Sequence, residues 1–287
     1  MPEVIALIFD FDDTLLPDST TMLLESRGID TDRFWKVEAK ALLDEGYDPT
    51  IAYLNLILEN VGPDKPLGNL TNKDLSAFGA TLDDKFFPGV FELADDLKAL
   101  VRETSKDIAI EFYIISGGLQ EVILGSKFVR ETFDGVYGCL FGEDESGVLK
   151  RIKRTITFTE KTRYLFEINK GITQADTLQN QYLVNKHVPE ETRRVAFRNM
   201  IYVGDGLTDI PCFSLVQKNR GTAFGIFKPT VKSSAKRAFL EFVKTDRVAS
   251  THSPKFAADE DLGALLRAAV ATNASQIYLA RKQAELR

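Results

Sequence analysis

Four short apolar runs stand out along the chain, and each is typical of a strand buried on both faces of a parallel sheet. The first covers residues 4–9 (VIALIF) without a polar side chain, and the second covers 108–115 (IAIEFYII). The third and fourth lie at 199–203 and 222–227. Segments of helical periodicity separate the runs. This alternation predicts an α/β fold with a mostly parallel central sheet.

The segments between the runs predict the rest of the core. Apolar stretches at 137–141 and 148–158 flank an acidic turn that contains glycine, which is typical of a hairpin. Helices on both faces of the sheet would complete a three-layer, Rossmann-like sandwich. Residues 169–197 are polar and carry no recognisable motif. The expected helices lie at 90–103, 119–128 and 159–168, with a last one from about residue 259.

Residues 17–86 differ from the rest because they contain helical patterns and no strand pattern. An all-helical block inserted after the first strand predicts a small cap domain at 17–86. The core domain would then comprise 1–16 and 87–287. Three helices are expected in the cap, at 20–27, 32–45 and 49–61, each followed closely by a glycine.

Polar clusters follow three of the four apolar runs, at 10–14 (DFDDT), 116–118 (SGG) and 204–209 (GDGLTD). The carboxyl ends of parallel strands lie side by side, so the clusters should face one crevice, where open α/β sheets bind their ligands. Several carboxylates brought together are unfavourable unless a cation neutralises them. Oxygen ligands without histidine or cysteine are those that Mg²⁺ prefers.

These clusters and their order resemble the signature of the haloacid dehalogenase (HAD) superfamily of phosphatases and phosphotransferases. That family has DxDxT after its first strand, a serine or threonine after a later strand, a lysine at the start of a helix, and GDGxxD. Residues 10–14, Ser116 and 204–209 match these motifs. The resemblance covers the core from residue 4 to about 228, and its general layout is similar to the phosphoserine phosphatase group.

The resemblance implies a role for each matching residue. Asp10 would attack phosphorus to form an aspartyl-phosphate. Asp12 would protonate the leaving oxygen and then activate the attacking water. Ser116 and the amide of Gly117 would bind the phosphoryl group, and Lys161 would neutralise charge on the nucleophile and the phosphate.

The resemblance also implies a Mg²⁺ site. Its ligands would be the carboxylates of Asp10 and Asp205 and the backbone carbonyl of Asp12, with Asp209 completing or supporting the shell. The metal would shield an anionic phosphate as it approaches the anionic nucleophile.

Three lysines are candidates for the motif lysine. Lys161 is favoured over Lys153 and Lys170 because it begins an expected helix just after the hairpin. The interval from Lys161 to Gly204 is longer than in compact members of the family. Asp13 stands where many members have glycine, a variation that the family tolerates.

Asp12 distinguishes the branches of the superfamily, because the resemblance implies that dehalogenases lack this aspartate and that the related ion pumps replace it with threonine. We therefore expect a Mg²⁺-dependent phosphatase acting on a small phosphorylated metabolite, since a cap would hinder large substrates. A phosphomutase or phosphotransferase with the same intermediate remains an alternative, as does a non-catalytic protein that binds a phosphorylated ligand. A dinucleotide site at 204–209 is disfavoured, because Asp209 replaces its third glycine.

Charge, hydropathy and cysteine content restrict the classes of partner and the compartment that we expect. The 287 residues carry a net charge of −6, which argues against nucleic acid as a partner. No run approaches the roughly 20 apolar residues of a membrane span. Cys139 and Cys212 form no CxxC pair, which suits a reducing compartment. These features predict a cytoplasmic protein with no membrane or nucleic-acid partner, and they indicate no oligomeric state.

Five further residues favour a structural interpretation. His187 and His252 are the only histidines and lie in polar segments without an evident partner, so both are predicted to be surface residues. Phe34, Trp35 and Val37 could line a substrate pocket but are more typical of ordinary core.

Overall fold

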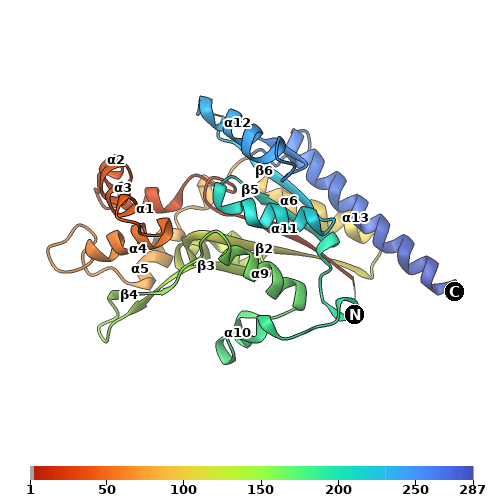
Figure 1. Ribbon diagram of the computed structural model, residues 1–287, viewed down its shortest axis with the longest axis horizontal. Coiled ribbons are helices and arrows are strands. Elements are labelled where there is room, and N and C mark those ends of the chain that lie inside the picture. The colour runs from red at the N-terminus through yellow and green to blue at the C-terminus, as the bar shows by residue number, and fades with distance from the viewer. Residues whose placement is uncertain (1–2, 230, 287) are drawn as a thin grey trace.

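The computed structural model describes residues 3–229 and 231–286, and a seven-stranded sheet forms its centre (Figure 1). The strand order is β4-β3-β2-β1-β5-β6-β7. Neighbouring strands are parallel except for β3 and β4, which form the predicted antiparallel hairpin. The predicted α/β fold is therefore confirmed. The strands are β1 (Glu3–Phe9), β2 (Ile108–Leu119), β3 (Gly135–Glu143), β4 (Leu149–Arg154), β5 (Met200–Gly204), β6 (Thr222–Ile226) and β7 (Ser250–His252).

Helices cover both faces of the sheet because successive side chains of its central strands are buried in opposite directions. In β1, Ile5 and Leu7 belong to one apolar cluster, whereas Ala6 and Ile8 belong to the cluster on the other face. The result is the predicted three-layer sandwich. The covering helices are α6 (Val90–Thr104) and α13 (Asp261–Glu285) on the first face, and α9 (Glu160–Lys170) and α11 (Ile210–Lys218) on the second.

The second strand is longer than its apolar run predicts. The sequence predicts that the strand ends before the polar cluster at 116–118, but β2 continues to Leu119, with a shift in its pairing to β3 between Ile115 and Leu119. The prediction of a single helix at 119–128 is also wrong. Two short helices replace it, because the Ser126 hydroxyl accepts a hydrogen bond from the Val129 amide (3.1 Å) and starts a new helix. They are α7 (Gln120–Gly125) and α8 (Lys127–Thr132).

The last part of the chain holds a strand that the sequence did not predict. Before α13 come a helical stretch, α12 (Lys232–Ala238) with the π-helical η7 (Phe239–Val243), and then β7. Only three residues of β7 pair with β6, too few to form a recognisable pattern. His252, predicted to have no partner, lies at the end of β7 with its Nε2 2.6 Å from the Ser250 hydroxyl.

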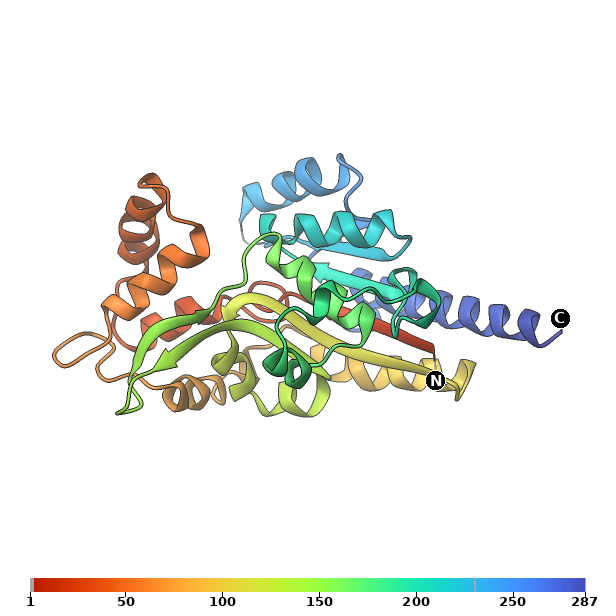
Figure 2. The same cartoon turned by 60° about the horizontal axis from the view of Figure 1, so that its bottom comes forward.

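All the regular elements between residues 17 and 86 are helical, as predicted. Both views place α1–α4 beyond the carboxyl end of β1, at the opposite end of the molecule from the C-terminal end of α13 (Figures 1 and 2). The expected helix at 32–45 contains a π-helical turn in its middle. The separation of this block as a domain of its own stays a prediction. Its elements are α1 (Ser19–Ser26), α2 (Thr31–Arg33), η1 (Phe34–Ala39), α3 (Lys40–Asp44), α4 (Pro49–Glu59), α5 (Asn72–Gly79) and η2 (Asp83–Lys85).

Close backbone contacts join this helical block to the core. Helix α5 packs on α7, and a Cβ added to Gly79 would lie 1.9 Å from the carbonyl oxygen of Val122. The amide of Leu149, at the start of β4, donates a 2.9 Å hydrogen bond to the carbonyl of Leu70. The close contact between α5 and α7 therefore requires glycine at position 79.

Residues 169–197 contain only short helical elements, and the two cysteines, Cys139 and Cys212, are buried and unpaired. No helix within the described part of the chain is both long and apolar enough to cross a membrane. The short elements are α10 (Gln174–Gln179), η3 (Leu183–Asn185), η4 (Glu190–Thr192) and η5 (Phe197–Asn199), and one further turn, η6 (Leu207–Asp209), follows β5.

Candidate functional site

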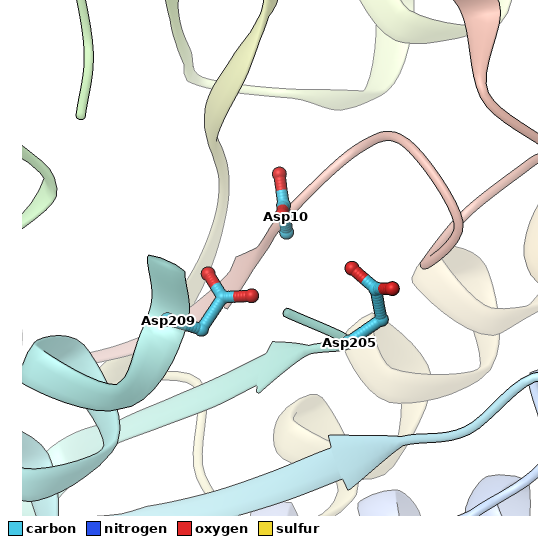
Figure 3. Close-up of side chains that lie close together, drawn as sticks. All are labelled: Asp10, Asp205 and Asp209. Carbon is cyan, nitrogen blue, oxygen red and sulfur yellow. The ribbon is translucent and has the colours of Figure 1, made fainter. Parts of the chain in front are cut away.

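Three aspartates meet where β1 and β5 end side by side. Asp10 directly follows β1, and its amide donates a 2.9 Å hydrogen bond to the carbonyl of Val203 in β5. Asp205 and Asp209 follow β5, and one carboxylate oxygen of each of the three aspartates lies within 4.8 Å of the others (Figure 3). This donor set of hard oxygens can hold a metal ion.

Asp209 is fixed in place by its own loop. Its side chain is fully buried. The Tyr202 hydroxyl donates to Oδ1 (2.7 Å), and the Gly206 amide donates to Oδ2 (3.0 Å). A Cβ on Gly204 would lie 2.5 Å from Asp209 Cγ, so glycine is required there for the carboxylate to fold back over the strand end.

Lys161 joins two of these aspartates. It is the second residue of α9 and 1% exposed, and its Nζ lies 2.9 Å from Asp10 Oδ2 and 2.7 Å from Asp209 Oδ1. Burial lowers the pKa of Lys161, but the two carboxylates outweigh burial and hold that pKa above its ordinary value. Lys161 is therefore a buried cation that bridges the ends of β1 and β5.

The two rival lysines lie away from this cluster. Lys170, at the end of α9, donates from Nζ to the carbonyls of Val184 (2.6 Å) and Lys186 (2.8 Å). Lys153 is exposed on β4. Of the three candidates, only Lys161 contacts the aspartates of the described cluster.

Asp12 is held beside the cluster by the first residue of α1. Its Oδ1 accepts a 2.7 Å hydrogen bond from the Ser19 amide. Burial raises the pKa of Asp12 well above its usual range, and the nearby charge of Asp18 raises it further. The other oxygen, Oδ2, packs over Gly118 of β2, where an added Cβ would lie 2.3 Å from it. A raised pKa favours a carboxyl that can hold and release a proton.

The 116–118 segment presents polar groups at the same end of the sheet. Ser116 is buried, and its hydroxyl oxygen accepts a 3.0 Å hydrogen bond from the Gly118 amide. The carbonyl of Gly117 accepts hydrogen bonds from the Tyr53 hydroxyl and, at 3.1 Å, from the Cys139 thiol. Tyr53 belongs to α4, so the helical block reaches into the site at this point.

An ion pair beside the cluster was not anticipated from the sequence. Asp13 adopts φ = 58°, a left-handed conformation, and its carboxylate pairs with Lys228. Burial raises the pKa of Asp13, and Lys228 opposes that rise. Lys228 comes two residues after β6. The expectation that residues following the carboxyl ends of parallel strands lie together could therefore have placed Lys228 near the site.

The electrostatic balance of the site favours a bound cation. Burial raises the pKa of Asp10 to about 6, because Lys161 offsets burial only in part and Asp209 adds repulsion. Burial also raises the pKa of Asp205 well above its usual range, with Asp10 and Asp209 adding to the rise. A divalent cation would relieve this repulsion. The site gathers five carboxylates, Asp10, Asp12, Asp13, Asp205 and Asp209, around two ammonium groups, Lys161 and Lys228.

The aspartate cluster does not lie in the cavity that the structure contains beside β2 and β3. A cavity of about 840 Å³ is lined by Tyr113, Arg130 and Gln174, among others, and shares no residue with the cluster. Its charged groups already have partners. Arg130 donates to the carbonyls of Leu124 (2.5 Å) and Gly125 (2.7 Å), Arg194 pairs with Glu111, and Asp134 accepts a hydrogen bond from the Phe112 amide. The convergence of titratable groups, rather than cavity size, therefore identifies the candidate site.

Comparison with known proteins identifies the class of fold. No protein-family model matches the chain. Among solved structures it resembles a HAD-family hydrolase from Salmonella enterica serovar Typhi, with a TM-score of 0.57 and 17% identity, covering 94% of this chain and 72% of that one. It also resembles a probable phosphoserine phosphatase from Vibrio cholerae, with a TM-score of 0.52 and 16% identity, covering 98% and 68%. The chain has the HAD hydrolase fold, and the predicted resemblance is confirmed at that level.

A curated relative places the chain in a family. An uncharacterised protein from Borreliella burgdorferi is 31% identical over 236 residues, which are 74% of this chain and 78% of that protein. This chain belongs to the same family as the Borreliella protein, whose name assigns no activity. The activity therefore has to be inferred from the site.

Proposed function

We propose that the protein is a Mg²⁺-dependent phosphomonoester hydrolase that acts on a small phosphorylated metabolite through an aspartyl-phosphate. The observation that carries the proposal is the placement of Lys161, buried between Asp10 and Asp209 at 2.9 and 2.7 Å. The Asp10 carboxylate at the end of β1 is thus stabilised by the charge of Lys161. Asp12 is held beside it by a separate hydrogen bond from the Ser19 amide. The names of the two structural neighbours, a hydrolase and a probable phosphatase, agree with this chemistry.

In the first step, a carboxylate oxygen of Asp10 attacks phosphorus, and the bond from phosphorus to the leaving oxygen breaks. The Asp12 carboxyl gives its proton to that oxygen. The raised pKa of Asp12 supports this role, because the group retains its proton at a higher pH than an ordinary aspartate. Ser116 and the Gly117 amide bind the phosphoryl oxygens, and Lys161 balances their charge.

In the second step, water attacks the aspartyl-phosphate and Asp12 accepts its proton. The bond from phosphorus to the Asp10 oxygen breaks, which releases inorganic phosphate and regenerates both carboxyl groups. The two steps need one acid–base group in opposite protonation states. Asp12 fits because the 2.7 Å hydrogen bond from the Ser19 amide fixes one of its oxygens and leaves the other for proton transfer.

Mg²⁺ would be held by Asp10 and Asp205, with Asp209 as a ligand or support. When bound, it neutralises charge on the phosphoryl group and its nucleophile. The surplus of carboxylates over ammonium groups supports this assignment, as does the absence of histidine and cysteine from the described cluster.

The first test is phosphate release from nitrophenyl phosphate with added Mg²⁺ and with a chelator. We expect chelation to lower the rate at least about 100-fold, because the surplus negative charge would then oppose the anionic substrate. Restoring Mg²⁺ should restore the rate. Phosphate release that is unaffected by exhaustive chelation would refute the metal assignment.

The same assay separates the alternatives. A phosphomutase or phosphotransferase would move phosphate to another carbon compound, so product analysis would find an organic phosphate in place of inorganic phosphate. A non-catalytic binding protein would bind orthophosphate in the presence of Mg²⁺ and release none from any substrate.

Gly118→Ala tests whether Asp12 is the acid. The new Cβ would lie 2.3 Å from Asp12 Oδ2 and push this carboxyl out of position, and a displacement of about 1 Å can cost about 100-fold in rate. We expect kcat/KM to fall by about that factor for an alkyl phosphate. The fall should be much smaller for nitrophenyl phosphate, whose leaving group needs no proton.

Gly142→Ala is the matched control, since its added Cβ would have 3.9 Å to the nearest neighbouring atom, the Arg151 carbonyl oxygen. Thermal unfolding of both variants checks the fold. An equal loss of kcat/KM for alkyl and aryl phosphates in Gly118→Ala would contradict the assignment of Asp12.

A further inference from the structure

A carboxylate and an indole ring of the helical block are connected to the turn of helix that binds Asp12. The Ser19 amide that binds Asp12 directly follows Asp18, whose own side chain accepts a 2.9 Å hydrogen bond from the Thr21 amide and caps α1. The Thr21 hydroxyl in turn accepts a 2.8 Å hydrogen bond from Trp35 Nε1. Asp18 and Trp35 are thus tied to the same turn of helix that holds Asp12.

Aromatic contacts continue from Trp35 back to the sheet. The rings of Trp35 and Tyr53 lie 5.7 Å apart at an interplanar angle of 58°, and Phe34 packs edge-on against Trp35 at 4.9 Å. The Tyr53 hydroxyl donates to the Gly117 carbonyl. These contacts form a continuous series from helix α1, through Trp35 and Tyr53, to the Gly117 carbonyl in β2. Among the described residues, no lysine or arginine forms a salt bridge with Asp18 or lies over the ring of Trp35 or Tyr53.

No lysine or arginine of the helical block is buried beside Asp12. Within residues 17–86, all of which the structure describes, every lysine and arginine is solvent-exposed. Four of them pair with neighbouring acids of the block. Near the aspartates, Lys161 is paired with Asp10 and Asp209, and Lys228 with Asp13. The basic residues of the block are Arg27, Arg33, Lys36, Lys40, Lys65, Lys73 and Lys85.

From this geometry we propose that the leaving group of the substrate carries an ammonium ion and no carboxylate, so that the substrate is the phosphate monoester of an amino alcohol. The proposal rests on the proposed phosphatase function and names the substrate class of that site. A cation gains from the faces of Trp35 and Tyr53 and from the charge of Asp18. A carboxylate on the leaving group would meet the negative charges of Asp18 and Asp12. The two nearby lysines, Lys161 and Lys228, are already paired with other carboxylates. Asp18 directly precedes Ser19, whose amide binds Asp12 Oδ1 at 2.7 Å.

Two matched pairs of substrates test the proposal by initial rates of phosphate release. The first pair is phosphocholine and its neutral isostere, in which a tert-butyl group replaces the trimethylammonium group. The second pair is phosphoethanolamine and phosphoserine, which differ by one carboxylate. We expect kcat/KM to be at least about tenfold higher for the first member of each pair.

Asp18→Asn links the preference to the structure. Asparagine is also a good N-cap, so α1 should remain intact while the charge is lost. The ratio of kcat/KM for phosphocholine over its isostere should fall at least about fivefold, and the isostere serves as the internal reference. Asp30→Asn is the control, because Asp30 caps α2 through the Arg33 amide (3.0 Å) in the same way but is exposed on the surface. This control should leave the ratio unchanged.

The outcomes separate this inference from the function on which it rests. If nitrophenyl phosphate is hydrolysed but phosphocholine and its isostere react equally well, the ammonium inference is overturned and hydrolysis stands. If no compound releases phosphate, hydrolysis is refuted, and calorimetric binding of the same four compounds decides the inference. Equal affinity for phosphocholine and its isostere would overturn it.

Discussion

Replacing Asp10 by asparagine should abolish phosphate release, with kcat reduced at least about 10⁴-fold. Removal of a catalytic nucleophile commonly has an effect of this size or larger. Asparagine has the same shape and can keep the 2.7 Å hydrogen bond from the Phe11 amide, so the loss would come from chemistry and not from unfolding. Steady-state phosphate release and thermal unfolding of the purified variant measure the two separately.

Asp134→Asn is the matched control for this variant. The Asp134 carboxylate also accepts a backbone hydrogen bond, from the Phe112 amide at 2.9 Å, but it lies just before β3, two strands away from β1, and does not belong to the aspartate cluster. Its activity should equal that of the wild type. If the Asp10→Asn protein retains more than about one tenth of the wild-type rate, Asp10 is not the nucleophile.

The position of the site at the strand ends could be predicted because local patterns encode it. The run at 4–9 has no polar residue, so β1 could be placed, and Asp10 necessarily follows it. The same argument placed Asp205 after β5. Two such strands paired in parallel bring their following residues together. This part of the site required no knowledge of distant contacts.

Other features depend on contacts that sequence spacing does not encode. The strand-like conformation of Ser116 follows from the irregular pairing of β2 with β3. The hydrogen bond from Tyr53 to the Gly117 carbonyl joins residues 64 positions apart. The position of Lys228 just after β6 follows from the strand pattern, but its pairing with Asp13 joins the first strand end to the sixth. Each is a long-range contact between residues that are individually ordinary, so a pattern along the chain cannot reveal it.

Replacing Lys161 by methionine should affect both rate and stability. The change removes the positive charge and leaves Asp10 and Asp209 buried next to each other. Loss of one preorganised charge-stabilising group typically costs about 10²–10³-fold in kcat, and breaking a buried ion pair typically costs about 3–5 kcal/mol in the free energy of unfolding. Phosphate release with Mg²⁺ and urea unfolding in chelator measure the two effects.

The two rival lysines supply the controls. Lys153 is exposed, and Lys170 contacts only backbone carbonyls outside the site. Lys153→Met and Lys170→Met should therefore keep the wild-type kcat, although Lys170→Met loses two hydrogen bonds. A larger loss of kcat in either variant than in Lys161→Met would transfer the role of the motif lysine to that residue.

The stability loss in Lys161→Met should grow with pH in the absence of metal. Lys161 lowers the pKa of Asp10, which burial alone raises, and the wild-type value is about 6. Without the lysine that pKa rises further, so the folded state binds a proton in a pH range where the unfolded state, with an ordinary aspartate, does not. Stability then falls as pH increases through this range. Urea unfolding should show the variant closest to wild type near the ordinary pKa of aspartate and furthest from it above neutrality. A difference independent of pH would mean that lost packing, and not unpaired charge, accounts for the effect.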